Sequence, residues 1–137
     1  MNSLDTELFV NMKKGNRRAI ASMISLIERG GEDVESCQKL LQQHTGQAWR
    51  IGITGPPGAG KSSIVAELTK VFRAHSHRVG IIAVDPSSPL TNGAVLGDRI
   101  RMPELDSDPD VFIRSVATRG ETTGLSLETS SIADVLD

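Results

Sequence analysis

Apolar residues follow a helical period over the first 48 residues of the chain. Five of them recur at the spacing of one helix face: Ala19, Ile20, Met23, Ile24 and Ile27. The pair Gly30-Gly31 comes next and is expected to end that helix, because glycine readily adopts a left-handed cap conformation. Asp33 is expected to cap a second helix, whose apolar side would carry Val34, Cys37, Leu40 and Leu41.

The pattern changes near residue 50. The short apolar stretch Ile51–Thr54 predicts a strand, the Gly/Pro-rich residues 55–60 predict a turn, and a helix is expected after them. The apolar residues of that helix are Ile64, Val65, Leu68, Val71 and Phe72. The continuous apolar run Val79–Val84 is typical of a strand buried on both faces. Strand, helix and strand in this order form a βαβ unit, which predicts two parallel strands in one sheet.

Three further segments complete the predicted order of elements. Residues 86–109 hold most of the prolines and are expected to form a loop with a short helical piece near 96–102. Val111-Phe112-Ile113 is a third strand candidate. Residues 124–137 are expected to begin a helix.

Composition narrows the class of protein. A chain of 137 residues is long enough for one domain. Its 15 basic and 17 acidic side chains give a net charge of −2, which argues against a broad nucleic-acid surface, and 3% aromatic residues argue against a base-stacking platform. The single cysteine, Cys37, excludes an internal disulfide framework and a Cys-rich zinc site, and it is expected to be a core residue. His44, His75 and His77 form no metal-binding set. No long apolar run or secretory signal is visible, so we expect a cytoplasmic protein.

Residues 55–62 match the P-loop pattern G-x-x-x-x-G-K-[ST] at every fixed position. The glycines let backbone N–H groups approach an anion closely, and the helix that follows directs its free N–H groups at the same phosphates. Lys61 would reach the β- and γ-phosphates, and the Ser62 hydroxyl can ligate Mg²⁺. An ordinary Gly-rich turn with a solvated Lys61 is the alternative. The expected phosphate-binding residues are Gly55, Pro56, Pro57, Gly58, Ala59, Gly60, Lys61, Ser62 and Ser63.

Acidic and basic residues beyond the loop are further candidates. Asp85 directly follows the second strand, at the end that faces the ligand crevice in open parallel sheets, and it would hold Mg²⁺ or position the attacking water. Asp85 as a cap of the turn at Pro86 is the alternative. Asp98 lies in a segment that would order around a γ-phosphate, although a solvated surface charge is an alternative. Arg114 and Arg119 follow the third strand candidate and would face phosphates or a protein partner, or simply lie in a polar loop.

Together these residues resemble one family of P-loop GTPases, the ArgK/MeaB family, which includes the methylmalonic aciduria type A protein. The resemblance covers nearly the whole chain. It is carried by residues 15–20 (GNRRAI), 52–63 (GITGPPGAGKSS), 84–88 (VDPSS), 96–102 (LGDRIRM), 112–115 (FIRS) and 119–120 (RG). The fold implied is an α/β P-loop NTPase-type parallel sheet, incomplete here, with an N-terminal helical extension. We expect the extension to span residues 1–48 and the P-loop part to span residues 49–137.

The resemblance also implies a function. Family members bind and hydrolyse GTP with Mg²⁺ and act as chaperones of adenosylcobalamin-dependent mutases, typically methylmalonyl-CoA mutase, and the full-length form is expected to be a homodimer. Carried over by position, Lys61, Asp85 and Asp98 would be the catalytic residues. Ser62, Asp85 and Asp98 would lie at the metal, and GTP or GDP would occupy the loop.

The chain ends before two further motifs of a GTPase, a second acidic segment and an Asn-Lys-x-Asp type loop that selects guanine. We therefore expect the N-terminal part of a GTPase, with weak or no turnover by this chain alone. The alternatives are a phosphate-binding module without turnover, an interaction fragment with an idle P-loop, and a kinase-type protein of the basic amino-acid transport label.

Overall fold

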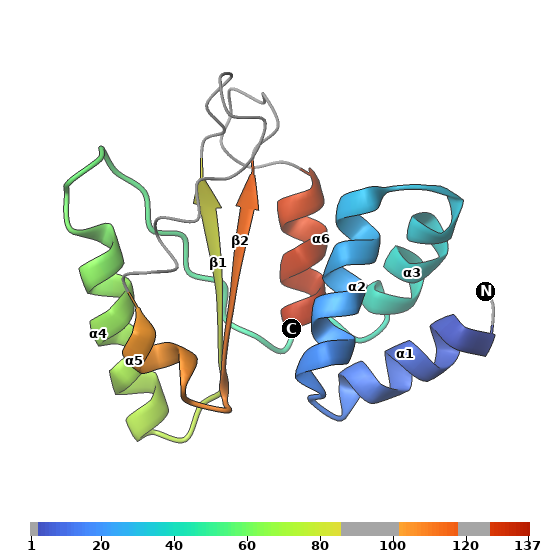
Figure 1. Ribbon diagram of the computed structural model, residues 1–137, viewed down its shortest axis with the longest axis horizontal. Coiled ribbons are helices and arrows are strands. Elements are labelled where there is room, and N and C mark those ends of the chain that lie inside the picture. The colour runs from blue at the N-terminus through green and yellow to red at the C-terminus, as the bar shows by residue number, and fades with distance from the viewer. Residues whose placement is uncertain (1–2, 86–101, 118–126) are drawn as a thin grey trace. The chain divides into compact units, whose positions relative to one another are not determined.

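The computed structural model describes residues 3–85, 102–117 and 127–137 (Figure 1). Its elements in chain order are α1 (Ser3–Lys13), α2 (Arg17–Arg29), α3 (Glu32–Gln42), α4 (Lys61–Ala74), β1 (Val79–Asp85), α5 (Pro103–Asp106), β2 (Val111–Ala117) and α6 (Leu127–Leu136). Contacts divide the chain into two compact units. The helical unit comprises Met1–Arg50 with Leu125–Asp137, and the P-loop unit comprises Ile51–Gly124.

Helix α2 forms as its sequence predicts. The Asn16 side chain caps its first turn by accepting hydrogen bonds from the N–H groups of Arg18 and Ala19, at 3.0 and 3.1 Å. Gly30 ends the helix with a φ of 71°, a backbone conformation that other residues rarely adopt. Four of the five predicted apolar positions are buried, namely Ala19, Met23, Ile24 and Ile27. The 3.6-residue period therefore identified the buried face correctly.

Helix α3 begins earlier than predicted. Its N-cap is Gly31, with a φ of 117°, and the helix starts at Glu32. The expectation that Asp33 caps this helix is therefore wrong, because the two glycines turn the chain so sharply that Asp33 already lies in the first turn. Cys37 and Leu41 are buried, as expected for the apolar side of the helix.

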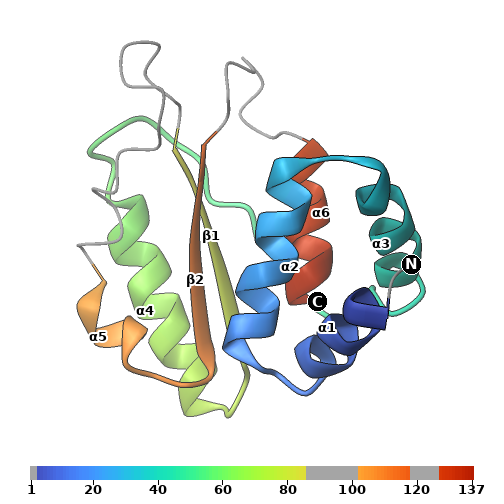
Figure 2. The same ribbon diagram turned by 45° about the vertical axis from the view of Figure 1, so that its right-hand side comes forward.

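Helix α6 confirms the helix predicted for residues 124–137, and it packs with α2 and α3 inside the helical unit (Figure 2). Ile132 and Val135 contribute its buried side chains, at 0% and 6% exposure. The Gln38 amide of α3 donates a hydrogen bond to the Ser131 hydroxyl at 2.8 Å. The core of this unit is thus built from helices that lie far apart in the sequence.

The P-loop unit is an α/β structure with a parallel sheet. Strand β1 pairs with β2 in parallel, from Val79 opposite Val111 to Asp85 opposite Ala117. A buried cluster of Ile81, Leu105 and Val111 lies against this pair, and the partly buried residues packed on it are Val65, Ala66, Val79, Met102 and Ile113. Helices α4 and α5 thus contribute to one cluster on the sheet.

Two expectations about the sheet are wrong. Residues 51–54 form no strand, because an extended segment becomes a strand only when a neighbour pairs with it, and no described strand lies alongside. The predicted pairing of this segment with β1 is replaced by the pairing of β1 with β2. Strand β1 is not buried on both faces either. Ile81 is the only buried residue among 79–84, since the helices that the structure describes in this unit pack into a single cluster.

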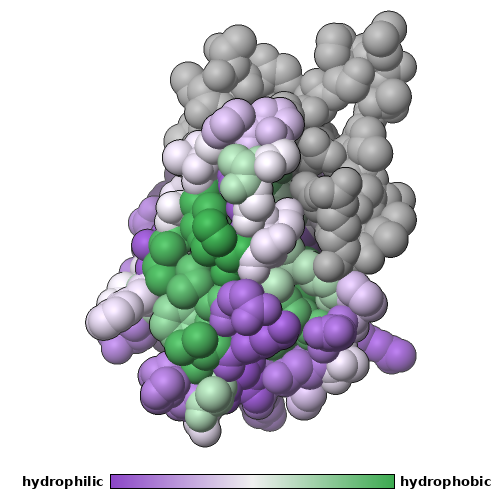
Figure 3. All heavy atoms as spheres, turned by 90° about the vertical axis from the view of Figure 1, so that its left-hand side faces the viewer, coloured by the Kyte–Doolittle hydropathy of each residue, from purple (hydrophilic) through white to green (hydrophobic). Residues whose placement is uncertain are grey.

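The outer face of α4 carries exposed apolar side chains. Figure 3 shows apolar residues gathered among charged ones on the side of the P-loop unit that carries this helix. Ile64 and Val71 are 53% and 54% exposed, whereas Thr69 on the opposite face is 2% exposed. None of the helices in the described part of the chain has the length and apolar character needed to span a membrane.

Candidate phosphate-binding site

The direction of α4 places residues 55–60 at the carboxyl end of the sheet. Four residues, 75–78, join α4 to β1, so the helix runs antiparallel to the strand. A helix of 14 residues and a strand of 7 residues have matching lengths, about 21 and 23 Å at their usual rises. The start of α4 therefore lies at the same end of the unit as the last residues of β1 and β2 (Figure 1). Ligands of open parallel sheets bind at that end.

Two glycines give the loop its shape. Gly58 and Gly60 have φ values of 76° and 85°, in the left-handed region where a Cβ is unfavourable. Inside the loop, the Ala59 N–H donates to the Pro56 carbonyl at 3.3 Å. The second fixed glycine of the P-loop pattern, Gly60, thus coincides with a backbone conformation that favours glycine, and Gly58 at a variable position of the pattern does so too.

Helix α4 begins with uncapped N–H groups. Its N-cap is Gly60, which has no side chain to accept a hydrogen bond, and the first backbone bond of the helix runs from the Ile64 N–H to the Gly60 carbonyl at 3.0 Å. The N–H groups of Lys61, Ser62 and Ser63 come before that bond, so they have no partner within the helix. Together with the helix dipole, these donors make a site suited to an anion.

The Lys61 side chain lies across the loop. Its ammonium donates to the carbonyls of Gly55 and Pro56, both at 2.8 Å. An ammonium has three N–H donors, so these two bonds leave one for a phosphate oxygen. Gly55 lies close under this side chain, since a Cβ built there would be 3.8 Å from the Lys61 Cδ. The carbonyls of the loop thus hold the Lys61 charge over the loop.

The hydroxyls at the start of α4 differ in exposure. Ser62 is half-buried and Ser63 is exposed, as are residues 55–60. Ser62 follows Lys61 in the first turn and provides a hard oxygen donor next to the phosphate site.

The structure describes some of the other predicted site residues and not others. Asp85 is the last residue of β1, at the carboxyl edge, but its side chain lies outside the described residues. Asp98 and Arg119 also lie outside them. Arg114 does not follow the strand as predicted, because β2 continues to Ala117 and places Arg114 opposite Ile82 inside the sheet. The cross-strand pairing with β1 extends this strand beyond the predicted Val111–Ile113.

One group that sequence reasoning missed holds the far end of α4. The Arg73 guanidinium donates to Asp108 and Asp110 and to the His77 carbonyl, each at 2.8 Å. The hydrogen bond to Asp108 is the main cause that raises the pKa of Arg73. A basic residue in the last helical turn and an Asp-Pro-Asp turn are visible in the sequence, but their 35-residue separation concealed the pairing.

Comparison with known proteins identifies relatives of the chain. A family model described as "Methylmalonyl Co-A mutase-associated GTPase MeaB" matches residues 20–137. A protein of Pyrococcus abyssi whose name describes it as a GTPase is 50% identical over 131 residues, which cover 96% of this chain and 40% of that protein. The methylmalonic aciduria type A homolog of Mus musculus is 35% identical over 137 aligned residues, covering 90% of this chain and 33% of that protein.

A further relative is named as a mutase. The fused isobutyryl-CoA mutase of Cupriavidus metallidurans is 43% identical over 109 residues, which cover 77% of this chain and 10% of that protein. The chain spans about 40% of the length of the Pyrococcus proteins that it matches.

Proposed function

Because the chain belongs to the family of methylmalonyl-CoA mutase-associated GTPases, we propose that residues 55–63 bind the phosphates of GTP and GDP and that the protein hydrolyses GTP. The observation that carries this proposal is the loop itself. Two left-handed glycines shape its backbone. The uncapped N–H groups at the start of α4 and the Lys61 ammonium place positive charge at this loop. A nucleotide phosphate carries the negative charge that such a site attracts.

The residues divide the work of binding and catalysis. The backbone N–H groups at the start of α4 and the Lys61 ammonium bind the β- and γ-phosphates and stabilise the charge that grows on them during hydrolysis. Asp85 at the end of β1 and Asp98 orient the attacking water and the metal ion. These two roles are proposals that follow from the family and from the position of Asp85 at the carboxyl edge.

The donors present fit a magnesium ion. Mg²⁺ prefers oxygen ligands and usually takes one or two from the protein, with the rest from substrate phosphates and water. The Ser62 hydroxyl supplies such an oxygen in the first turn of α4, and the carboxylates of Asp85 and Asp98 would add others. When bound, the ion would neutralise charge on the phosphates.

The partner follows from the family rather than from the loop. We propose that the protein assists an adenosylcobalamin-dependent mutase as a chaperone. The family description names methylmalonyl-CoA mutase, and one relative carries the name fused isobutyryl-CoA mutase. A homodimer, a cytoplasmic location and a boundary between residues 48 and 49 stay predictions, which light scattering, fractionation and limited proteolysis would test.

Nucleotide titration tests the proposed function. GDP, GTP and ATP are titrated by calorimetry with and without Mg²⁺ against the wild type, Lys61→Ala and Lys70→Ala. Lys70 is a matched control, because it lies on the same helix and pairs with Glu67 at 2.8 Å. We expect binding that Lys61→Ala weakens and Lys70→Ala leaves unchanged. Equal affinities in all three proteins would refute the role of the loop. If the wild type binds GTP but a phosphate assay detects no hydrolysis, the result would support a phosphate-binding module without turnover and would contradict the proposed GTP hydrolysis.

A further inference from the structure

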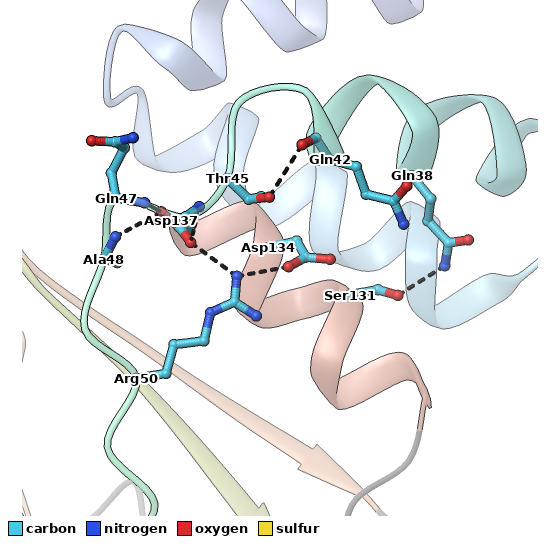
Figure 4. A network of polar contacts seen from close by, with 10 residues as sticks. Gln38, Gln42, Thr45, Gln47, Ala48, Arg50, Ser131, Asp134 and Asp137 are labelled. Atoms are coloured by element: carbon cyan, nitrogen blue, oxygen red, sulfur yellow. Dashed lines mark hydrogen bonds and ion pairs between the residues drawn. The ribbon is translucent and has the colours of Figure 1, made fainter.

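The Asp137 side chain gathers four hydrogen bonds from one short segment. Its carboxylate accepts from the N–H groups of Gly46, Gln47 and Ala48 at 2.9, 2.9 and 2.8 Å, and from the Arg50 guanidinium at 2.9 Å (Figure 4). Only 1% of the Asp137 side chain is exposed. Three consecutive backbone donors and a guanidinium thus enclose one carboxylate.

The negative charge of Asp137 lies near that of Asp134, and Arg50 compensates both charges. Asp134 and Asp137 are three residues apart, so their like charges repel each other unless a cation lies between them. Arg50 compensates both, since the same guanidinium nitrogen donates to Asp134 at 2.7 Å and to Asp137. The acidic end of α6 and residues 46–50 are therefore complementary in charge and in hydrogen-bonding groups.

The segment that Asp137 holds precedes the phosphate-binding loop by four residues, 51–54. The side chains of residues 46–50 are exposed, so apolar packing contributes little to their placement. Residues 51–54, between this segment and the loop, form no strand in the structure. Among the described residues, the contacts of Asp137 and Arg50 are therefore the nearest upstream anchor of the loop.

We propose that Asp137 is a positioning residue for nucleotide binding, because its carboxylate fixes residues 46–50 and so limits the freedom of the chain that enters the loop. This inference rests on the proposed function of residues 55–63. Asp137 touches no phosphate in this scheme. Its effect reaches the loop through the seven residues, 51–57, that connect Arg50 to Gly58.

The chain contains its own reporter for this anchor. Trp49 is the only tryptophan, there is no tyrosine, and its side chain is 89% exposed. It lies between Ala48 and Arg50, both of which bond to Asp137. The anisotropy of its fluorescence therefore reports how firmly the segment is held.

The experiment compares Asp137→Asn with Asp134→Asn. Asparagine keeps the shape of aspartate but loses the charge, and Asp134 is the matched control because it bonds to Arg50 without contacting the backbone of 46–48. We expect Asp137→Asn to speed amide exchange at 46–48 and at 58–62 about tenfold, to lower Trp49 anisotropy and to raise the Kd for Mg-GDP about tenfold. Asp134→Asn should change each of these about twofold or less.

The outcomes separate this inference from the proposed function. Faster exchange at 46–48 with unchanged exchange at 58–62 and an unchanged Kd would overturn the positioning role. Unchanged exchange at 46–48 would overturn the anchor itself. A wild type that binds no nucleotide would refute the proposed function, while exchange at 58–62 would still decide whether Asp137 positions the loop. If circular dichroism shows that Asp137→Asn does not fold, Arg50→Met takes its place, because methionine keeps an apolar stem but removes the guanidinium that donates to Asp137.

Discussion

Two isoleucines allow burial to be tested with the same chemical change. Ile132 of α6 is 0% exposed and Ile64 of α4 is 53% exposed. Substitution by alanine removes the same three carbon atoms at both positions. At Ile132 the lost transfer free energy is roughly 2.4 kcal/mol at about 0.8 kcal/mol per methylene, and the cavity left behind brings the total cost to about 3–4 kcal/mol. At Ile64, where half the side chain is already in water, the cost is about 1 kcal/mol.

Urea unfolding measures the difference. Because residues 1–50 and 125–137 form one unit, the anisotropy of Trp49 fluorescence should report the loss of the helical unit, and circular dichroism should report all the helices. We expect Ile132→Ala to lower the urea midpoint by more than 1 M at a slope of about 1–3 kcal/mol per molar. Ile64→Ala should move it by about a third of that amount. Equal shifts for the two variants would refute the assignment of α6 to the core of the helical unit.

Three further predictions concern single groups. Thr69→Val should leave the free energy of unfolding unchanged or raise it by about 1 kcal/mol, because the buried Thr69 hydroxyl donates to the Val65 carbonyl, which the helix already satisfies; urea unfolding measures this. Gly60→Ala should cost about 1–2 kcal/mol from its φ of 85° alone, because no atom lies within 4 Å of the added Cβ, and a loss of 4 kcal/mol or more would contradict this. Burial raises the pKa of Asp137, but the bonds from the Gly46 N–H, the Arg50 side chain and the neighbouring N–H groups outweigh it and hold the pKa well below its usual range. The unfolded chain therefore binds a proton at Asp137 more tightly than the folded chain does. The contribution of Asp137 to the free energy of unfolding is complete above about pH 5 and is lost as the pH falls below about 4. Asp137→Asn should therefore flatten the pH dependence of the unfolding midpoint below about pH 5.

The local elements were predictable because local patterns cause them. The buried face of α2 follows from its apolar period, and its C-terminal end follows from Gly30. The P-loop pattern likewise requires Gly60, and the left-handed φ of Gly60 agrees with it, whereas the left-handed φ of Gly58 lies at a variable position of the pattern. Each of these features depends on residues a few positions apart.

The features that were missed depend on distant partners. Whether Ile51–Thr54 becomes a strand is decided by a neighbouring strand and not by its own apolar character. The four bonds to Asp137 join positions between 87 and 91 residues apart, so no local pattern signals them. Arg73 and Asp108 are separated in the same way.

The clamp at Arg73 has a mechanical consequence for the opposite end of its helix. Successive residues of an α-helix are turned by about 100° around its axis, so the donors at Lys61, Ser62 and Ser63 fan out in fixed directions. A helix held only by packing can rotate about its axis. Such a rotation changes the direction of all three N–H groups by the same angle. The three bonds of Arg73 resist that rotation from the far end of α4, because Asp108, Asp110 and the His77 carbonyl hold the guanidinium from different sides. The direction of these N–H groups around the helix axis therefore depends on Arg73, which lies about 20 Å away at the other end of α4 and touches no phosphate.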